Sequence, residues 1–167
     1  MLSGQLNNNI KAINNFKRIL LGARMTEVSY GETFNLFFEQ NFNHNAREIA
    51  KFVFSIDAMC WFGNRDEWLK KVNEPENADR REREDCLLAF EIVRLRYNNF
   101  IQIQRVEFYD DFFSIEFPGD NILSIAYYAE SDYAWFLEEV SPQKEHERMV
   151  IGCSGNKIFH NNIPEFI

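Results

Sequence analysis

In the first third of the chain, apolar residues recur first at the spacing of a helix and then at the spacing of β-strands. Residues 5–21 carry apolar side chains at helical spacing, and Gly22 ends that pattern. The residues that follow alternate between apolar and polar, as strands with one buried face do. This alternation predicts a hairpin over 25–41 with its turn at 31–33, and a third strand over 52–58. The alternating apolar residues are Val28, Tyr30, Phe34, Leu36, Phe38, Phe52, Phe54 and Ile56.

The second half of the chain returns to helical spacing and then to strands. Two capping pairs typical of helix N-termini predict a short helix followed by a longer one; they are Asn64 with Glu67 and Asp79 with Glu82. The longer helix has an apolar stripe that consists of Cys86, Phe90, Val93 and Tyr97. Residues 100–129 supply three strands with a strong turn at 118–120. Their alternation slips between Ile103 and Val106, which indicates a β-bulge.

The hairpins of the two halves share one apolar frame. They align when one residue is added at the second turn, and the aligned pairs are Val28 with Val106, Tyr30 with Phe108, Phe34 with Phe113, Leu36 with Ile115 and Phe38 with Phe117. Further on, "CWF" at 60–62 resembles "AWF" at 134–136, so we expect both Trp61 and Trp135 in the core. These matches predict an internal repeat.

The expected fold is therefore α+β, with two helix-plus-three-strand repeats around a mainly antiparallel β-sheet and the helices packed on the sheet. We expect one domain over 1–167, repeats at 5–62 and 79–136, and a C-terminal hairpin at 147–160. A chain of 167 residues with 46% hydrophobic residues is long enough to bury a sizeable core.

Nothing in the sequence predicts export or membrane insertion. The start lacks a basic run before an apolar block, and no stretch approaches the ~18 apolar residues of a membrane helix. Cys60, Cys86 and Cys153 are odd in number and far apart, which fits neither a disulfide framework nor a metal knuckle. The expected location is the cytoplasm, with no membrane partner.

The net charge of −8 belongs to one segment. Residues 98–140 contain nine acidic residues and a single base, Arg105, whereas the remaining chain holds 17 acids and 17 bases. Such a field repels nucleic acid phosphates and attracts basic proteins. We therefore expect a basic protein as partner and no nucleic acid.

Several of these acids sit where the aligned first half has other residues. The positions of Glu107 and Glu116 correspond to Ser29 and Phe37, which indicates that the fold does not require the charges. Strand alternation points Glu116 and Ser114 to solvent, where exposed Tyr and carboxylates suit recognition of a cationic protein. The predicted partner-binding residues are Glu107, Tyr109, Asp110, Asp111, Glu116, Tyr128, Glu130 and Asp132. A merely solvated strand face is the alternative.

No residue pattern predicts catalysis, a metal or a cofactor. His44, His146 and His160 share no metal-ligand spacing, and "GCSGN" at 152–156 lacks the final Gly of a nucleophile elbow. Adjacent carboxylates at a turn tip diverge into water and make a poor catalytic cleft. Neither a phosphate-binding loop nor a dinucleotide fingerprint occurs. We expect no enzyme activity.

The phrases "LLGARMTEVSYGETFNLFFEQN" (20–41) and "DAMCWFGNRDEW" (57–68) resemble the helix-hairpin phrasing of bacterial immunity proteins, including those of contact-dependent growth inhibition and other polymorphic toxin systems. The resemblance implies an antitoxin that binds a cognate toxin domain, often a nuclease with a basic cleft, and blocks its active site. Two alternatives stay open: an acidic secretion chaperone or adaptor that binds an effector protein, and a metal-dependent enzyme.

Overall fold

The computed structural model describes residues 3–31, 33–42, 49–74, 79–140, 148–155 and 157–163. Within these ranges the chain forms three helices and ten strands, which confirms the α+β class. The helices are α1 (Ser3–Leu20), α2 (Arg65–Asn73) and α3 (Arg80–Tyr97). The first half contains strands β1 (Arg24–Tyr30), β2 (Phe34–Gln40), β3 (Ala50–Ile56) and β4 (Cys60–Phe62). The second half contains β5 (Arg105–Phe108), β6 (Phe112–Phe117), β7 (Asn121–Ala126), β8 (Trp135–Glu139), β9 (Val150–Ser154) and β10 (Lys157–Asn161).

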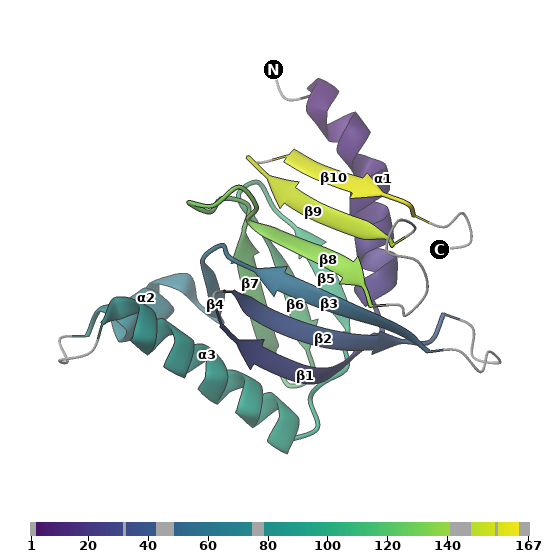
Figure 1. Cartoon of the computed structure of the whole chain (residues 1–167). Coiled ribbons are helices and arrows are strands. Elements are labelled where there is room, and N and C mark those ends of the chain that lie inside the picture. Colours follow the sequence, from purple (N-terminus) through teal and green to yellow (C-terminus); the bar gives the residue numbers. More distant parts are fainter. Residues whose placement is uncertain are drawn as a thin grey trace.

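The strands form two antiparallel sheets, where the sequence led us to expect one (Figure 1). Sheet A has the order β1-β2-β3-β8-β9-β10, and sheet B has the order β4-β7-β6-β5. Each half of the chain thus builds a three-stranded meander in a sheet of its own. The C-terminal strands β9 and β10 form a hairpin that extends sheet A beyond β8.

Each half also sends its fourth strand into the sheet of the other half. β4 follows β3 along the chain but pairs with β7, and β8 follows β7 but pairs with β3. The two crossing connections are hydrogen-bonded to the opposite half: the amides of Asp57 and Ala58 donate to the carbonyl of Ala134, and the amide of Ala126 donates to the carbonyl of Met59. The two halves are therefore interlocked.

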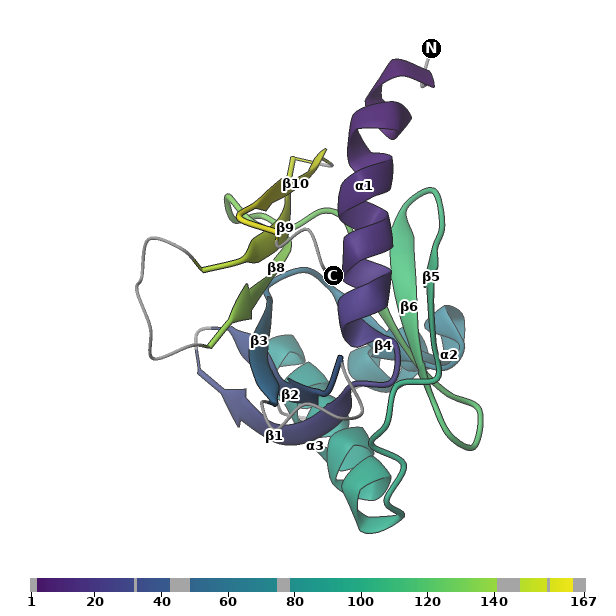
Figure 2. The same cartoon turned by 90° about the vertical axis from the view of Figure 1, so that its right-hand side faces the viewer.

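The sheets pack face to face, and α1 fills the space between them at one side of the molecule (Figure 2). Phe16 of α1 is fully buried and contacts four rings, with centroids between 5.0 and 5.7 Å away. Two of the rings lie in sheet A and two in sheet B; they are Phe54, Trp135, Phe108 and Phe113. Phe113 also contacts Trp135 directly, at 5.0 Å between centroids. One helix residue thus joins the cores of both sheets.

The segments that follow α1 and α3 pair with each other. Gly22 and Asn99, both at positive φ, end the two helices. Residues 22–25 and 101–103 are then linked by backbone hydrogen bonds around an antiparallel bridge between Arg24 and Gln102. The slip in alternation between Ile103 and Val106 lies at the start of β5, where Gln104 and Arg105 both lie opposite Glu116. The amide of Gln104 donates to the Glu116 carbonyl and Arg105 is the register partner of Glu116, as in the predicted bulge.

Helix α3 buries a different face from the stripe found in the sequence. Its buried residues are Leu88, Ile92 and Leu95. The predicted stripe is solvent-exposed, with Phe90 at 64%, Val93 at 63% and Tyr97 at 89% exposure, and Cys86 is exposed as well. Both faces carry apolar residues at helical spacing, and packing against the rest of the molecule selects one of them.

The contacts of Phe16 predict a large and specific loss of stability in Phe16→Ala. Removal of the ring takes away its packing against both sheets and leaves a cavity, which costs about 3–5 kcal/mol of unfolding free energy. Urea denaturation followed by circular dichroism measures the loss. Phe90→Ala on α3 removes an identical ring from an exposed site and is the control, with an expected change within about 0.5 kcal/mol. Equal losses in the two variants would contradict the role of Phe16.

Candidate functional site

Three of the eight residues predicted to bind a partner are acids that are ion-paired within the chain, which neutralises part of the expected charge. Glu107 lies 3.5 Å from Lys17, Asp111 lies 3.7 Å from Arg65, and Glu116 lies 2.7 Å from Arg105. Ser114, which alternation pointed to solvent beside Glu116, is only 7% exposed.

The tip of the β5–β6 hairpin holds the next two predicted residues. Tyr109 is half-exposed and stacks on Phe112 at 4.6 Å between centroids, and its carbonyl accepts a hydrogen bond from the Tyr127 hydroxyl at 3.0 Å. Asp110 beside it is exposed. Asp132 is also exposed but lies in the connection between β7 and β8, where its carbonyl accepts a hydrogen bond from Ser154 at 2.6 Å.

The last two predicted residues, Tyr128 and Glu130, line a cavity of about 610 Å³. Its walls come from the β1–β2 turn, the β3–β4 connection, the first turns of α3 and residues 128–130. The carboxylates that line it are Asp57, Asp79, Glu84, Asp85 and Glu130. Among the described lining residues there is no Lys or Arg.

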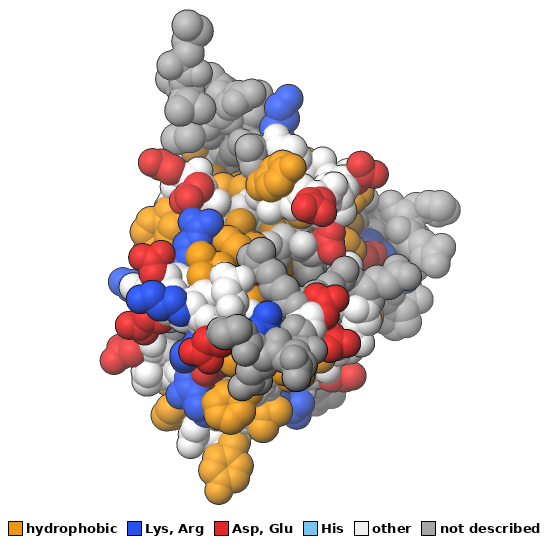
Figure 3. All heavy atoms as spheres, turned by 90° about the vertical axis from the view of Figure 1, so that its left-hand side faces the viewer, with side chains coloured by type: hydrophobic (Ala, Val, Ile, Leu, Met, Phe, Trp, Pro, Cys, Tyr) orange, Lys and Arg blue, Asp and Glu red, His pale blue; other side chains and the backbone are white. Residues whose placement is uncertain are grey.

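The walls of this acidic cavity combine an apolar floor with a polar rim. Buried apolar side chains make the floor; they are Phe34, Ile56, Ala58, Cys60 and Leu88. Tyr30 and Tyr128 are exposed and stand at the rim with the carboxylates. Figure 3 faces this side of the molecule, and red carboxylate side chains predominate in its right-hand half, whereas red and blue intermingle in its left-hand half. Such a cavity fits a ligand that is part apolar and part cationic.

Two groups of the acidic cavity are held in their protonated forms. Burial raises the pKa of the Cys60 thiol, and the nearby Glu84 and Asp85 carboxylates raise it further. Burial also raises the pKa of the Tyr30 phenol, with Cys60 and Asp85 adding to the effect. Because the thiolate is the nucleophilic form of cysteine, Cys60 at neutral pH is a packing residue with poor reactivity.

Other site chemistry is not assembled in the part of the chain that the structure describes. That part contains no group of three or more His, Cys, Asp or Glu side chains placed to hold a metal ion. His160 is exposed on β10, while His44 and His146 lie outside the described residues. None of the helices over the described ranges has the length and apolar character needed to cross a membrane.

Sequence reasoning found one edge of the acidic cavity and missed the rest. Asp57, Glu84 and Asp85 lie outside the segment 98–140 that holds the excess charge, and they come together with Glu130 only because the crossing connections meet α3. Asp57 lies within the third strand predicted over 52–58, so the alternation gave no sign that it borders a cavity.

Comparison of the chain with protein-family models, with curated proteins and with solved structures finds no match. The function is therefore argued from the geometry of the acidic cavity.

The cysteine environments predict one fast-reacting thiol. Cys86 is exposed on α3, while Cys60 and Cys153 are buried. Iodoacetamide at neutral pH should therefore alkylate Cys86 first and modify the other two only after denaturation, as read by peptide mass spectrometry. Cys86→Ser is the control and should remove the fast phase. Fast alkylation of Cys60 in the folded protein would show that the acidic cavity is open to its floor and that the thiol is reactive.

Proposed function

We propose that this protein is an immunity-type inhibitor that binds a basic toxin domain in the cytoplasm and blocks its active site. The observation that carries the proposal is the acidic cavity, whose described lining contains five carboxylates and no base. Positive side chains around a nuclease cleft would be attracted to this mouth from a distance and would pair with its carboxylates on contact.

The composition of the cavity favours a protein partner over other cationic ligands. Tyr30 and Tyr128 supply rigid contact area at the rim, and tyrosine is enriched at the centres of protein interfaces. Metal ions prefer several carboxylates converging on one point, and the described residues form no such cluster. The negative field disfavours nucleic acid. Binding rather than chemistry also agrees with the protonated state of Cys60.

The location of the acids also changes which carboxylates we expect to contribute to partner binding. Glu107, Asp111 and Glu116 already have cationic neighbours in the chain, so part of their field is cancelled. Tyr128 and Glu130 remain part of the proposed interface because they line the acidic cavity. Tyr109, Asp110 and Asp132 lie outside the cavity lining and form its nearest rival as a binding surface.

The test compares two variants of equal net charge. The rim variant combines Asp57→Asn, Asp85→Asn and Glu130→Gln, all within the cavity lining. The control combines Glu27→Gln, Asp110→Asn and Asp120→Asn, three exposed carboxylates outside it. The candidate partner to be tested is the C-terminal domain of the protein that the gene directly upstream encodes. We expect the rim variant to associate on the order of tenfold more slowly at low salt, with a flatter salt dependence, and the control to change little.

Stopped-flow binding measures the rates, and growth of cells that express the toxin domain measures protection. Thermal unfolding of both variants verifies that the fold is kept. An upstream product that is not toxic or does not bind would refute the immunity function. Slower association of the control alone would place the interface outside the acidic cavity.

A secretion adaptor is the second candidate, and one observation favours it. The exposed stripe of Cys86, Phe90, Val93 and Tyr97 on α3 has the spacing of a coiled-coil seam, and adaptors of this kind dimerise and bind effectors through apolar surfaces. Dimerisation that is abolished by Phe90→Ser with Val93→Ser would favour the adaptor over the inhibitor.

A further inference from the structure

The two halves of the molecule match each other residue by residue across their sheets. One cross-strand row in sheet A consists of Tyr30, Phe34, Ile56 and Trp135, and its counterpart in sheet B consists of Phe108, Phe113, Ile125 and Cys60. The neighbouring row in sheet A consists of Val28, Leu36, Phe54 and Leu137, and its counterpart consists of Val106, Ile115, Leu123 and Phe62. Strand order and register are the same in both halves.

The pairing between the halves has the symmetry that this match requires. Arg24 and Gln102, which form the bridge after the two helices, each lie four residues before the aligned valines Val28 and Val106. Around the bridge, the amide of Ile103 donates to the carbonyl of Ala23, and the amide of Met25 donates to the carbonyl of Ile101. Each of these two hydrogen bonds is the counterpart of the other, so the bridge lies on an approximate twofold axis.

This correspondence differs from the sequence match of "CWF" with "AWF". The residue that takes the place of Trp135 is Cys60, not Trp61, because Cys60 pairs with Ile125 as Trp135 pairs with Ile56. Trp61 pairs with Ser124 and lies on the other face of its strand, against Phe112. Both tryptophans are buried, as expected, but in different layers.

The acidic cavity occupies the counterpart of the site that holds Phe16. Three of the four rings around Phe16 have counterparts that line the cavity: Phe108 corresponds to Tyr30, Phe113 to Phe34, and Trp135 to Cys60. The buried residues of α3 also repeat the spacing of Ala12, Phe16 and Ile19 on α1, and one of them, Leu88, lines the cavity. The aromatic ring of Trp135 in one half thus corresponds to the thiol of Cys60 in the other.

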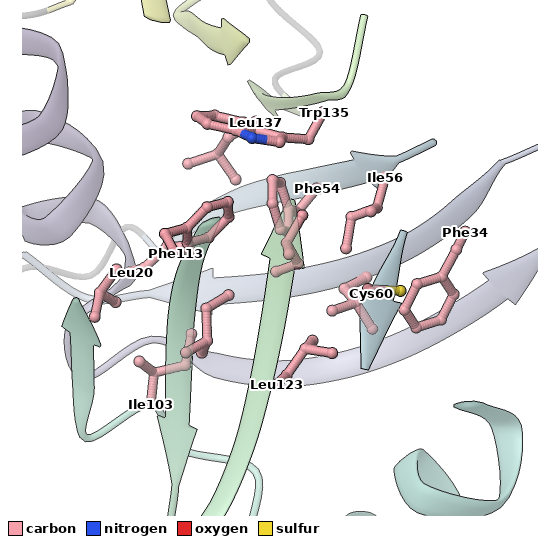
Figure 4. Close-up of a cluster of buried hydrophobic side chains, with 14 of the residues drawn as sticks. Leu20, Phe34, Phe54, Ile56, Cys60, Ile103, Phe113, Leu123, Trp135 and Leu137 are labelled. Atoms are coloured by element: carbon pink, nitrogen blue, oxygen red, sulfur yellow. The ribbon is translucent and has the colours of Figure 1, made fainter. Parts of the chain in front are cut away.

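The two sides of the core differ accordingly. Figure 4 shows Trp135, Phe54 and Phe113 gathered at one end of the buried cluster and Cys60 beside Phe34 at the other. Where the rings are present, the space between the sheets is filled. Where Cys60 takes the place of Trp135, the cavity of about 610 Å³ opens next to Phe34 and Cys60. This volume lies within the range of natural ligand sites and exceeds a single aromatic side chain.

The filled site also shows how a cation accompanies the ring. Lys17 follows Phe16 on α1, lies 5.8 Å from the centre of the Phe108 ring and pairs with Glu107 at 3.5 Å. In the acidic cavity the counterpart of Phe108 is Tyr30, with Asp85 close enough to influence its phenol. An aromatic side chain with an adjacent Lys or Arg would therefore make two contacts in the acidic cavity that Phe16 and Lys17 make in the other half. Its ring would pack on buried apolar side chains, and its cation would lie beside an aromatic ring and a carboxylate.

We propose that the acidic cavity accepts an aromatic side chain of the partner protein, with a neighbouring Lys or Arg of the partner at the rim. The inference rests on the proposed function, because it names the residues that the partner inserts. The partner's aromatic ring is then an anchor that enters a preformed pocket. The partner's Lys or Arg pairs with the carboxylates at the rim, and this charge selects a basic partner.

The test uses short peptides and the full-length protein. Acetyl-Phe-Lys-amide is titrated into ¹⁵N-labelled protein, and amide shifts are followed by NMR. We expect shifts at Tyr30, Gly31, Ala58 and Cys60, which line the cavity. Acetyl-Ala-Lys-amide keeps the charge without the ring, and acetyl-Phe-Glu-amide reverses the charge. Each should bind at least about tenfold more weakly, because burial of the ring and pairing of the base both contribute.

Variants that fill the acidic cavity complete the test. Cys60→Trp introduces the tryptophan that the counterpart position, Trp135, carries. Leu88→Phe fills the floor of the cavity from α3. If one of these variants does not fold, the other still provides the test. Both should abolish the peptide shifts. Leu87→Phe, at the adjacent position outside the lining, is the matched control and should keep them.

Equal binding of the Phe-Lys and Ala-Lys peptides, or no shifts at the cavity residues up to about 20 mM Phe-Lys peptide, would overturn the inference. Neither result touches the proposed function, which fails if the upstream product is not toxic or does not bind. Persistent shifts in Leu88→Phe would place the peptide outside the acidic cavity and would also overturn the inference.

Discussion

The exchange of β4 and β8 between the two sheets is the constraint on which the rest of the structure depends. Neither meander is complete alone, because β3 lacks β8 and β7 lacks β4 until both halves are folded. The exchange brings the two connections together at one side of the molecule, where they meet α3. It also holds the sheets face to face, so that α1 can place Phe16 between them.

One side of this interlocked arrangement is closed and the other is open. On the closed side the rings of Phe16 and Trp135 fill the space between the sheets, and on the open side Cys60, in the position equivalent to Trp135, lines the cavity. Protein interiors are packed densely, and an opening of this size next to the core is uncommon without a ligand. The carboxylates at its mouth then determine what kind of partner the opening attracts.

The sequence was sufficient for the parts of the fold that depend on local pattern. Alternation identified the hairpins and aligned Val28 with Val106, and Gly22 ended the first helix as expected. It could not show the strand exchange, since β4 has only three residues and its partner lies far along the chain. The charge excess led to Glu130 alone among the cavity acids, because the others belong to segments that are balanced in sequence and adjacent only in space.

Native-state hydrogen exchange tests the interlocked arrangement most directly. If the exchanged strands join the halves into one cooperative unit, the amides of Ser55 in the β3–β8 ladder and of Ser124 in the β7–β4 ladder will exchange with the same opening free energy, equal to that of global unfolding. A β4–β7 ladder that opens several kcal/mol more easily, while β3–β8 stays protected, would contradict the account.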